Sequence, residues 1–286
     1  MRFCSLTNED AGAVAVADGG SMRRVTPPTS ELQTVFDAVM DGAALELVST
    51  PEADPELGPP LRPGKIVAVG LNYRMHADES GVEAPRRPLI FAKFPSSVTG
   101  PSAPIVVDSS LAERVDWEVE LAVVVGRRMR HVSHADALDY VFGYTVANDV
   151  SARDVQFSDG QWTRAKSFDS FCPLGPVVVT PDELGPVDDL RLTTRVNGEL
   201  MQDDTTANMI FGVPELLSFC SRCFTLDAGD VVLTGTPDGC GEFMDPPRSL
   251  APGDVVEASI EGIGALRNEV VAANRGATTR PSEEEE

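Results

Sequence analysis

Basic residues are scarce in this chain. Its 286 residues include 23 Lys or Arg against 45 Asp or Glu, which gives a formal net charge of −22. Because proteins that bind nucleic acids neutralise phosphates with Lys and Arg, this balance argues against a nucleic-acid partner. The net negative charge also repels small anions, although salt screens the repulsion beyond about 8 Å. A site for an anion must therefore be made locally positive, by a metal or by a few basic side chains.

Long apolar runs are missing as well. No stretch approaches the roughly 18 apolar residues that a membrane helix needs. Near the N-terminus, Asn8, Glu9 and Asp10 interrupt the segment that would form the apolar core of a signal peptide. We therefore expect no membrane partner and a cytoplasmic location.

Cysteine is also scarce, with five residues in the chain. Only Cys220 and Cys223 lie close together, in a segment whose pattern predicts an amphipathic helix opened by Pro214. No second ligand pair and no thioredoxin-like context accompany them, so core packing is favoured over zinc or redox chemistry. A chain of this length can bury a core without disulfide bonds.

The sequence divides into three parts. Residues 1–60 predict a small N-terminal domain, with a helix capped by Ser30 and a proline-rich linker at its end. Residues 61–273 contain short apolar segments broken by Gly and Pro, which predict a β-rich α+β domain built as a mixed sandwich or barrel-like sheet. Residues 274–286 form an acidic tail that we expect to be disordered. The strands expected in the second part span residues 66–69, 89–91, 117–125, 140–148, 177–180, 192–196, 231–234 and 255–260.

The most informative segment is 115–125. If it forms one strand, alternate side chains share a face, so Asp116, Glu118 and Glu120 point the same way. Carboxylates this close cannot all stay ionised in a buried place without a cation. Taken alone, the segment is compatible with an exposed edge strand that has a solvated acidic face, and with a buried metal site.

The next strand favours the metal site. It is too apolar to be exposed and leads into Asp149, an acid at the mouth of a buried strand that needs a partner. An all-carboxylate set suits magnesium, manganese or calcium rather than zinc. Arg153 and Lys166 follow, and they are the residue types that bind a carboxylate.

The three histidines fall in two places. His76 and Glu79 are three residues apart, so one helical turn would put them on the same face, where Glu79 can orient the imidazole as a general base. The alternative is a surface pair in a polar loop. His131 and His134 lie in a polar connection after a strand, and we expect them at the surface.

Six segments, taken in order, resemble the fumarylacetoacetate hydrolase superfamily. They are GLNYRMHADE at 70–79, PLIFAK at 88–93, DWEVEL at 116–121, NDVSARD at 148–154, KSFD at 166–169 and TGTP at 234–237. The resemblance runs from about Lys65 to Val270. The chain is similar to the bacterial branch of acylpyruvases, oxaloacetate decarboxylases and 2-hydroxyhepta-2,4-diene-1,7-dioate isomerases. The resemblance implies that superfamily's β-rich fold and a homodimer.

The resemblance also implies a role for each matching residue. The implied magnesium ligands are Glu118, Glu120 and Asp149. The implied catalytic residues are His76 and Glu79, as a dyad on a lid, together with Lys166. The implied substrate contacts are Arg153, Gln156, Thr236 and Gly235. The loops 158–162 and 239–244, with parts of the N-terminal domain, are expected to meet the distal end of the substrate.

The activity that the resemblance implies is a magnesium-dependent hydrolase. It would cleave a C–C bond in a small anionic 2-oxo acid of the acylpyruvate or fumarylpyruvate kind, through a metal-stabilised enolate. Decarboxylation of an oxaloacetate-like acid and isomerisation of a 2-hydroxydienoate need the same enolate, so both stay open. A catalytically silent binding protein is a further alternative, and the intact set of ligands, lysine and dyad counts against it.

Overall fold

The structure is a computed structural model that describes residues 1–7, 13–18, 21–26, 29, 31–49 and 56–274. The predicted cap Ser30 and the acidic tail from residue 275 lie outside the described residues, as does the linker segment 50–55. The N-terminal elements are β1 (Arg2–Leu6), β2 (Ala13–Asp18), β3 (Ser21–Thr26), the 3-10 turn η1 (Leu32–Val35), α1 (Phe36–Met40) and β4 (Glu46–Ser49).

One large mixed sheet forms the frame of the molecule. Its other strands are β5 (Leu57–Gly58), β6 (Ile66–Gly70), β7 (Leu89–Lys93), β8 (Val98–Thr99), β11 (Val119–Val125), β12 (Val141–Asn148), β14 (Cys172–Val179) and β17 (Val231–Leu233). The strand order is β4-β3-β2-β1-β14-β12-β11-β17-β6-β7, with β5 beside β1 and β8 beside β14. The prediction of a β-rich α+β fold is confirmed.

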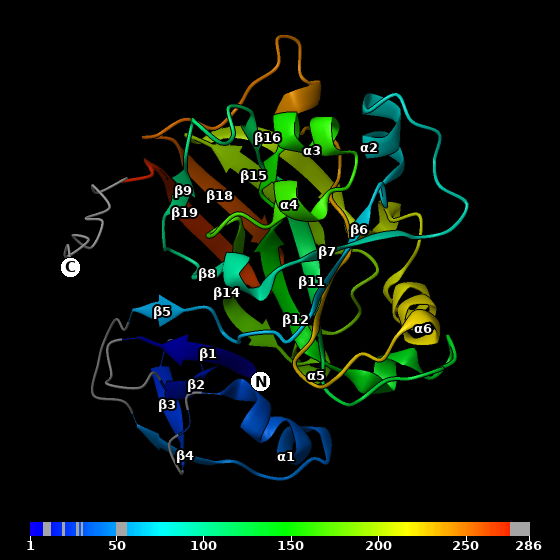
Figure 1. The fold of residues 1–286 in the computed structure, drawn as a ribbon. Helices are drawn as coiled ribbons and strands as arrows, with labels where there is room; N and C mark the ends of the chain where they lie inside the picture. The colour runs from blue at the N-terminus through cyan, green and yellow to red at the C-terminus, as the bar shows by residue number, and fades with distance from the viewer. Residues whose placement is uncertain (8–12, 19–20, 27–28, 30, 50–55, 275–286) are drawn as a thin grey trace, which may run out of the picture.

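The N-terminal strands continue this sheet. Arg2 and Phe3 of β1 pair with Val179 and Val178 of β14, so β1–β4 and α1 form one end of the molecule (Figure 1). An aromatic cluster ties this end to the rest, because the ring of Phe142 stacks on Phe36 at 4.0 Å. The division of the chain at residue 60 stays a prediction, and the described part of the N-terminal segment shares both a sheet and a core with the strands after residue 60.

A second sheet packs against the first. Its strands are β9 (Ile105–Val107), β15 (Arg191–Val196), β16 (Glu199–Thr205), β18 (Val255–Ile260) and β19 (Gly264–Ala272), in the order β16-β15-β18-β19-β9. On β11, Leu121 and Val123 pack into the core shared with this second sheet, whereas Ala122 and Val124 pack into the core shared with the N-terminal segment. Because both faces of β11 are covered, the strand is apolar along nearly all of its length.

The segment 115–125 is not one strand, so that prediction is wrong. It consists of β10 (Val115–Asp116), which pairs with β13 (Ser151–Ala152) in a separate sheet, and β11. Side chains satisfy the backbone between them: the Trp117 N–H donates to Asp116 Oδ1 at 2.9 Å, and the Glu118 N–H donates to Asn148 Oδ1 at 2.9 Å. These bonds replace the ladder bonds that a continuous strand would need.

The helices are short except for one. They are α2 (Arg74–Glu79), α3 (Arg153–Asp159), α4 (Thr163–Lys166), α5 (Pro181–Leu184) and α6 (Val213–Cys223), with 3-10 turns η2 (Pro95–Ser97), η3 (Ala137–Tyr140), η4 (Thr206–Asn208) and η5 (Gly241–Phe243). In Figure 1, α2, α3 and α4 gather at the end of the molecule opposite β1–β4. Across the described residues, no helix has the length and apolarity to span a membrane.

The structure shows how far the paired cysteines and the two histidines after the strand are buried. The expected helix around Pro214 is α6, and Cys220 is buried as expected, but Cys223 is exposed, so core packing is wrong for Cys223. It lies at the last residue of the helix, where the chain leaves the core. His131 and His134 are exposed, as predicted.

Candidate active site

Three carboxylates converge where β11 begins and β12 ends. The two strands are antiparallel, with Val119 opposite Asn148, so this register brings Glu118 and Glu120 beside Asp149. One oxygen from each of these acids lies within 4.8 Å of the others. None of the three residues is more than 4% exposed. The alternative of a solvated edge strand is therefore wrong.

Burial and neighbouring charges shift the pKa values of Glu120 and Glu118 in opposite directions. Burial, followed by the charges of Asp149 and Glu118, raises the pKa of Glu120 well above its ordinary value. Burial would also raise the pKa of Glu118, but Lys166 and Arg153 lower it to about 2. Glu120 accepts a hydrogen bond from the Gly235 backbone N–H at 2.6 Å. A cation placed among the three acids would relieve this repulsion.

Two buried lysines hold the acids in place. Lys166 Nζ lies 2.5 Å from Glu118 Oε2 and 2.9 Å from Asp149 Oδ2. Lys93 Nζ lies 2.6 Å from Asp149 Oδ1 and also donates to the carbonyl of Lys166. Burial lowers the pKa of Lys166, but Asp149 and Glu118 more than offset this, so the pKa rises above its ordinary value.

Sequence analysis gave no role to Lys93. Its signal was present, because a lysine that ends a strand and points into the core needs an anionic partner. The strand 89–93 is the neighbour of β6 in the sheet, and its last side chain is 2% exposed. What the sequence could not supply is the identity of that partner, which lies 56 residues away.

Replacing Lys93 by methionine should lower the free energy of unfolding by about 3–5 kcal/mol, because Asp149 loses a buried cationic partner. Urea unfolding in the presence of EDTA measures this cost. The matched control is Arg191→Met, which removes an exposed partner of Asp203 at 2.7 Å and should cost no more than about 1 kcal/mol. Equal costs for the two variants would contradict a stabilising role for Lys93.

Arg153 and Asp116 form a second layer behind the acids. Arg153 Nε donates to Asp116 Oδ2 at 2.8 Å, its Nη2 lies 2.7 Å from Glu118 Oε1, and its Nη1 donates to Gln156 Oε1 at 3.0 Å. The guanidinium is thus already paired with two acids. Asp116 also accepts from the Gly241 N–H at 2.8 Å and stands outside the three converging carboxylates. The prediction that Asp116 shares a face with the two glutamates is wrong, because the strand breaks between β10 and β11.

These side chains open on a cavity of about 120 Å³. The predicted site residues that line it are His76, Glu118, Glu120, Arg153, Gln156, Lys166 and Thr236. Its other walls are mostly apolar and include Val69, Val82, Phe91, Phe157, Trp162 and Phe243. Of these, Trp162 and Phe243 belong to the two loops that were expected to meet the substrate, whereas no described residue from 1–49 lines the cavity.

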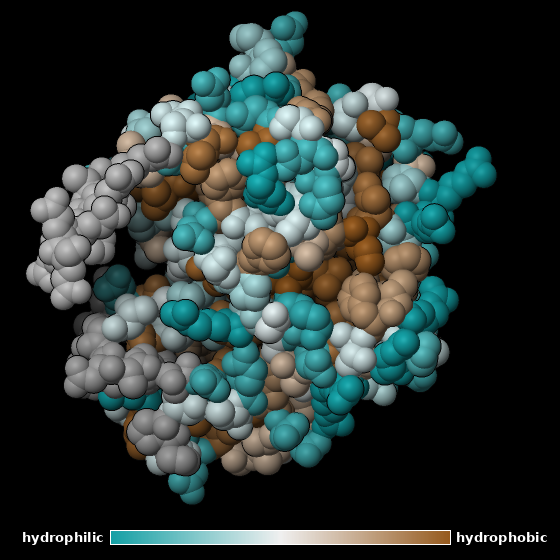
Figure 2. Space-filling view, in the orientation of Figure 1, coloured by the Kyte–Doolittle hydropathy of each residue, from teal (hydrophilic) through white to brown (hydrophobic). Residues whose placement is uncertain are grey.

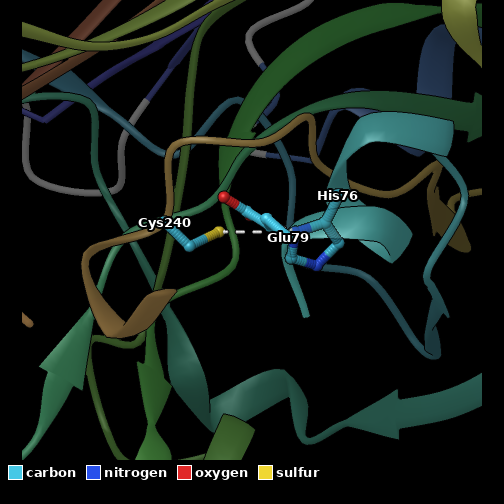
Figure 3. Close-up of side chains that lie close together, drawn as sticks. All are labelled: His76, Glu79 and Cys240. Atoms are coloured by element: carbon cyan, nitrogen blue, oxygen red, sulfur yellow. Dashed lines mark hydrogen bonds and ion pairs between the residues drawn. The ribbon is translucent and has the colours of Figure 1, made fainter. Parts of the chain in front are cut away.

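His76 and Glu79 form a pair on α2, as predicted. His76 Nδ1 lies 2.7 Å from Glu79 Oε1 (Figure 3). Glu79 Oε2 accepts from the Gly239 N–H at 2.9 Å. His76 is 6% exposed, so the alternative of a surface pair is wrong for it. Because Nδ1 is bonded to Glu79, Nε2 is the ring nitrogen left for proton exchange with a ligand in the cavity.

The loop 234–237 offers the cavity a hydroxyl. Thr236 Oγ1 accepts a hydrogen bond from Gln202 Nε2 at 2.9 Å, so its own hydrogen is available to a ligand. The Gly235 N–H, by contrast, is used by Glu120, and Gly235 does not line the cavity. Gln202 was missed by sequence analysis, because a glutamine in the alternating strand β16 carries no signal of burial.

The family described as "Fumarylacetoacetate (FAA) hydrolase C-terminal" matches residues 65–271, a range that holds every predicted site residue. The chain belongs to the fumarylacetoacetate hydrolase family. The resemblance noted in six segments of the sequence is thereby confirmed.

Several members of the family are closely similar to this chain. The mitochondrial oxaloacetate tautomerase Fahd2a of Rattus norvegicus is 47% identical over 216 residues, which cover 75% of this chain and 69% of the relative. The solved structure of a fumarylacetoacetate hydrolase from Exiguobacterium antarcticum has a TM-score of 0.87 at 38% identity, covering 96% of this chain and 100% of that one. A 5-carboxymethyl-2-hydroxymuconate delta-isomerase from Mycobacterium smegmatis has a TM-score of 0.80 with the same identity of 38% and the same coverage of 96% and 100%.

Proposed function

We propose that this fumarylacetoacetate hydrolase family member interconverts the keto and enol forms of a small 2-oxo acid such as oxaloacetate. The observation that carries the proposal is that Glu118 and Glu120, of the buried carboxylate cluster, and His76, of the dyad, line one cavity. The cluster suits a cation that polarises a 2-oxo group, and the dyad suits a proton transfer beside it. The names of the rat tautomerase and the mycobacterial isomerase support tautomerisation over hydrolysis as the proposed reaction.

The cluster fits a hard divalent cation, and we propose magnesium, with manganese or calcium as substitutes. The donors of Glu118, Glu120 and Asp149 are all carboxylate oxygens, and the raised pKa of Glu120, caused by burial and by the neighbouring acids, marks a surplus of negative charge. When bound, the cation would supply Lewis-acid polarisation of the substrate's 2-oxo group.

The dyad provides the proton transfer. His76 Nε2 removes a proton from the carbon next to the 2-oxo group, and the imidazolium so formed returns this proton to the 2-oxo oxygen, so the enol forms with no net gain or loss of protons. Glu79 orients the ring through Nδ1 and compensates the charge of the imidazolium. Lys166 places a positive charge beside the cluster where the enolate charge develops.

The remaining cavity residues bind and enclose the substrate. The Thr236 hydroxyl can donate to the substrate carboxylate, and Gln156, held by Arg153, also lines the cavity. The rings of Phe91 and Trp162 meet edge-on at 5.3 Å and close the apolar side. Such walls exclude water and thereby strengthen every charge interaction inside the cavity.

Hydrolysis of a 3-acylpyruvate is the second candidate. The orientation of His76 by Glu79 favours it, because the same pair can activate a water molecule for attack on the acyl carbonyl. Decarboxylation differs from both, because it needs the cation and Lys166 but no base. The three reactions therefore differ in their products and in their dependence on His76.

A mass-resolved screen of 2-oxo acids, with magnesium or EDTA, tests the proposal. For oxaloacetate we expect faster loss of the ultraviolet absorbance of the enol at unchanged mass, abolished by EDTA and restored by magnesium. Release of a carboxylic acid from acylpyruvates, or of carbon dioxide from oxaloacetate, would replace tautomerisation by one of the other two reactions. Binding without turnover of any substrate would support a catalytically silent protein instead.

We further propose a homodimer and a cytoplasmic location. In Figure 2, apolar surface gathers over α2, β6 and β7, where Met75, Val82 and Leu89 are exposed. A face of this kind beside the cavity supports a protein partner such as a second copy. Sedimentation velocity tests the assembly. The rat relative is named as mitochondrial, so cell fractionation is the test of location.

A further inference from the structure

A second group of metal-ligand atoms lies beside the cavity. His76 and Glu79 approach from α2, and Cys240 approaches from the loop between β17 and η5 (Figure 3). Cys240 Sγ lies 3.8 Å from His76 Nδ1, and Glu79 Oε1 lies 2.7 Å from the same nitrogen. Ligand atoms of all three residues fall within 4.8 Å of one another.

The chemistry of this group differs from that of the carboxylate cluster. One nitrogen, one sulfur and one oxygen donor suit zinc, which prefers Cys and His, rather than magnesium. In a tetrahedral zinc site, bond lengths of about 2.0 and 2.3 Å place nitrogen and sulfur about 3.5 Å apart. The observed separation of 3.8 Å between Nδ1 and Sγ is close to that value. The contact between Nδ1 and Glu79 has to widen by about 0.6 Å to reach zinc geometry, so an ion would replace their hydrogen bond.

Burial and access are both compatible with a metal. Cys240 is fully buried. Coordination releases the thiol proton to solvent as the sulfur–metal bond forms. His76 lines the cavity and the Glu79 side chain is 19% exposed, so an ion has access to two of the three ligands, and the fourth position is left to water.

We infer that His76, Glu79 and Cys240 form a second metal site, for a borderline-soft divalent cation such as zinc, and that its occupation switches the enzyme off. A metal on Nδ1 leaves the ring proton on Nε2, so His76 can no longer accept a proton there. It also takes Glu79 away from the ring. The binding stands independently of the proposed function, whereas the inhibition rests on it.

Cobalt(II) is the probe for binding, because a thiolate ligand gives it a charge-transfer absorption in the near ultraviolet that carboxylates do not. Titration should produce this absorption with one equivalent of cobalt, and zinc should abolish it. Cys240→Ser should remove this absorption and weaken zinc binding. Loss of an outer-shell partner lowers metal affinity by about 10–100-fold, and the loss expected here is larger because a direct ligand is removed. Cys223→Ser, which alters the exposed cysteine of α6, should leave both unchanged, and Glu120→Gln should leave the absorption.

The opposite pattern would overturn the site: no thiolate absorption in the wild type, or an absorption that survives Cys240→Ser and disappears in Cys223→Ser. If Cys240→Ser fails to fold, zinc X-ray absorption of the Cys223→Ser protein decides. One sulfur neighbour is expected, and a shell of oxygen and nitrogen alone contradicts the site.

An activity measurement tests the inhibition separately. With magnesium saturating, zinc should inhibit turnover of oxaloacetate by the wild type and leave Cys240→Ser active. If the proposed function is wrong, the cobalt absorption still appears but no oxaloacetate turnover is available to inhibit. Equal inhibition of both proteins would show that zinc acts elsewhere, for example at the carboxylate cluster.

Discussion

Replacing His76 by alanine should lower kcat for enol–keto conversion by about 10²–10⁴-fold, the usual contribution of a positioned general base. His76 is not one of the three converging acids, so the affinity for magnesium should stay near that of the wild type. Steady-state kinetics at saturating magnesium, together with calorimetric titration of the metal, measure both quantities. A lower kcat with an unchanged affinity for magnesium is the result expected if His76 is the general base.

Two variants serve as controls for His76→Ala. His134→Ala removes an exposed histidine and should leave kcat unchanged. Glu79→Gln keeps an oxygen that can bond Nδ1 but removes the charge, so its loss should be smaller than that of His76→Ala. A wild-type rate of enol–keto conversion in His76→Ala would exclude His76 as the base.

Replacing Glu120 by glutamine should abolish magnesium binding and lower activity by about 10³-fold or more, since a bound cation contributes several kcal/mol of charge stabilisation. The metal-free protein should nevertheless be at least as stable as the wild type. Glutamine can still accept the hydrogen bond from the Gly235 N–H, and it removes repulsion from Asp149 and Glu118. Calorimetric metal titration and urea unfolding in EDTA measure the two effects.

Addition of magnesium should then stabilise the wild type but not Glu120→Gln. At a concentration about 100-fold above Kd, the wild type should gain about 2.7 kcal/mol in free energy of unfolding, and Glu120→Gln should gain nothing. Asp203→Asn, which alters an exposed acid paired with Arg191, should gain as much as the wild type. A variant that still binds magnesium, or that is much less stable without it, would contradict the assignment of Glu120 as a ligand.

Local signals predicted a group of acids, but not which three of them converge. Alternation along 115–125 placed Asp116 with Glu118 and Glu120, whereas the set of Glu118, Glu120 and Asp149 came from the family resemblance. The dyad was predictable from a local signal, since His76 and Glu79 share one helical turn. By contrast, the break at Trp117 depends on hydrogen bonds that backbone N–H groups donate to the side chains of Asp116 and Asn148, which no alternation of residues reveals.

The sequence by itself determined the β-rich character of the chain, a group of neighbouring acids and the His76–Glu79 pair, because spacing and apolarity over a few residues are enough to specify them. Only the tertiary structure decided that β1 joins β14, that Lys93 bonds Asp149 and that Cys240 lies beside His76. These contacts join residues from 56 to more than 160 positions apart, and their distances depend on the register and packing of whole sheets.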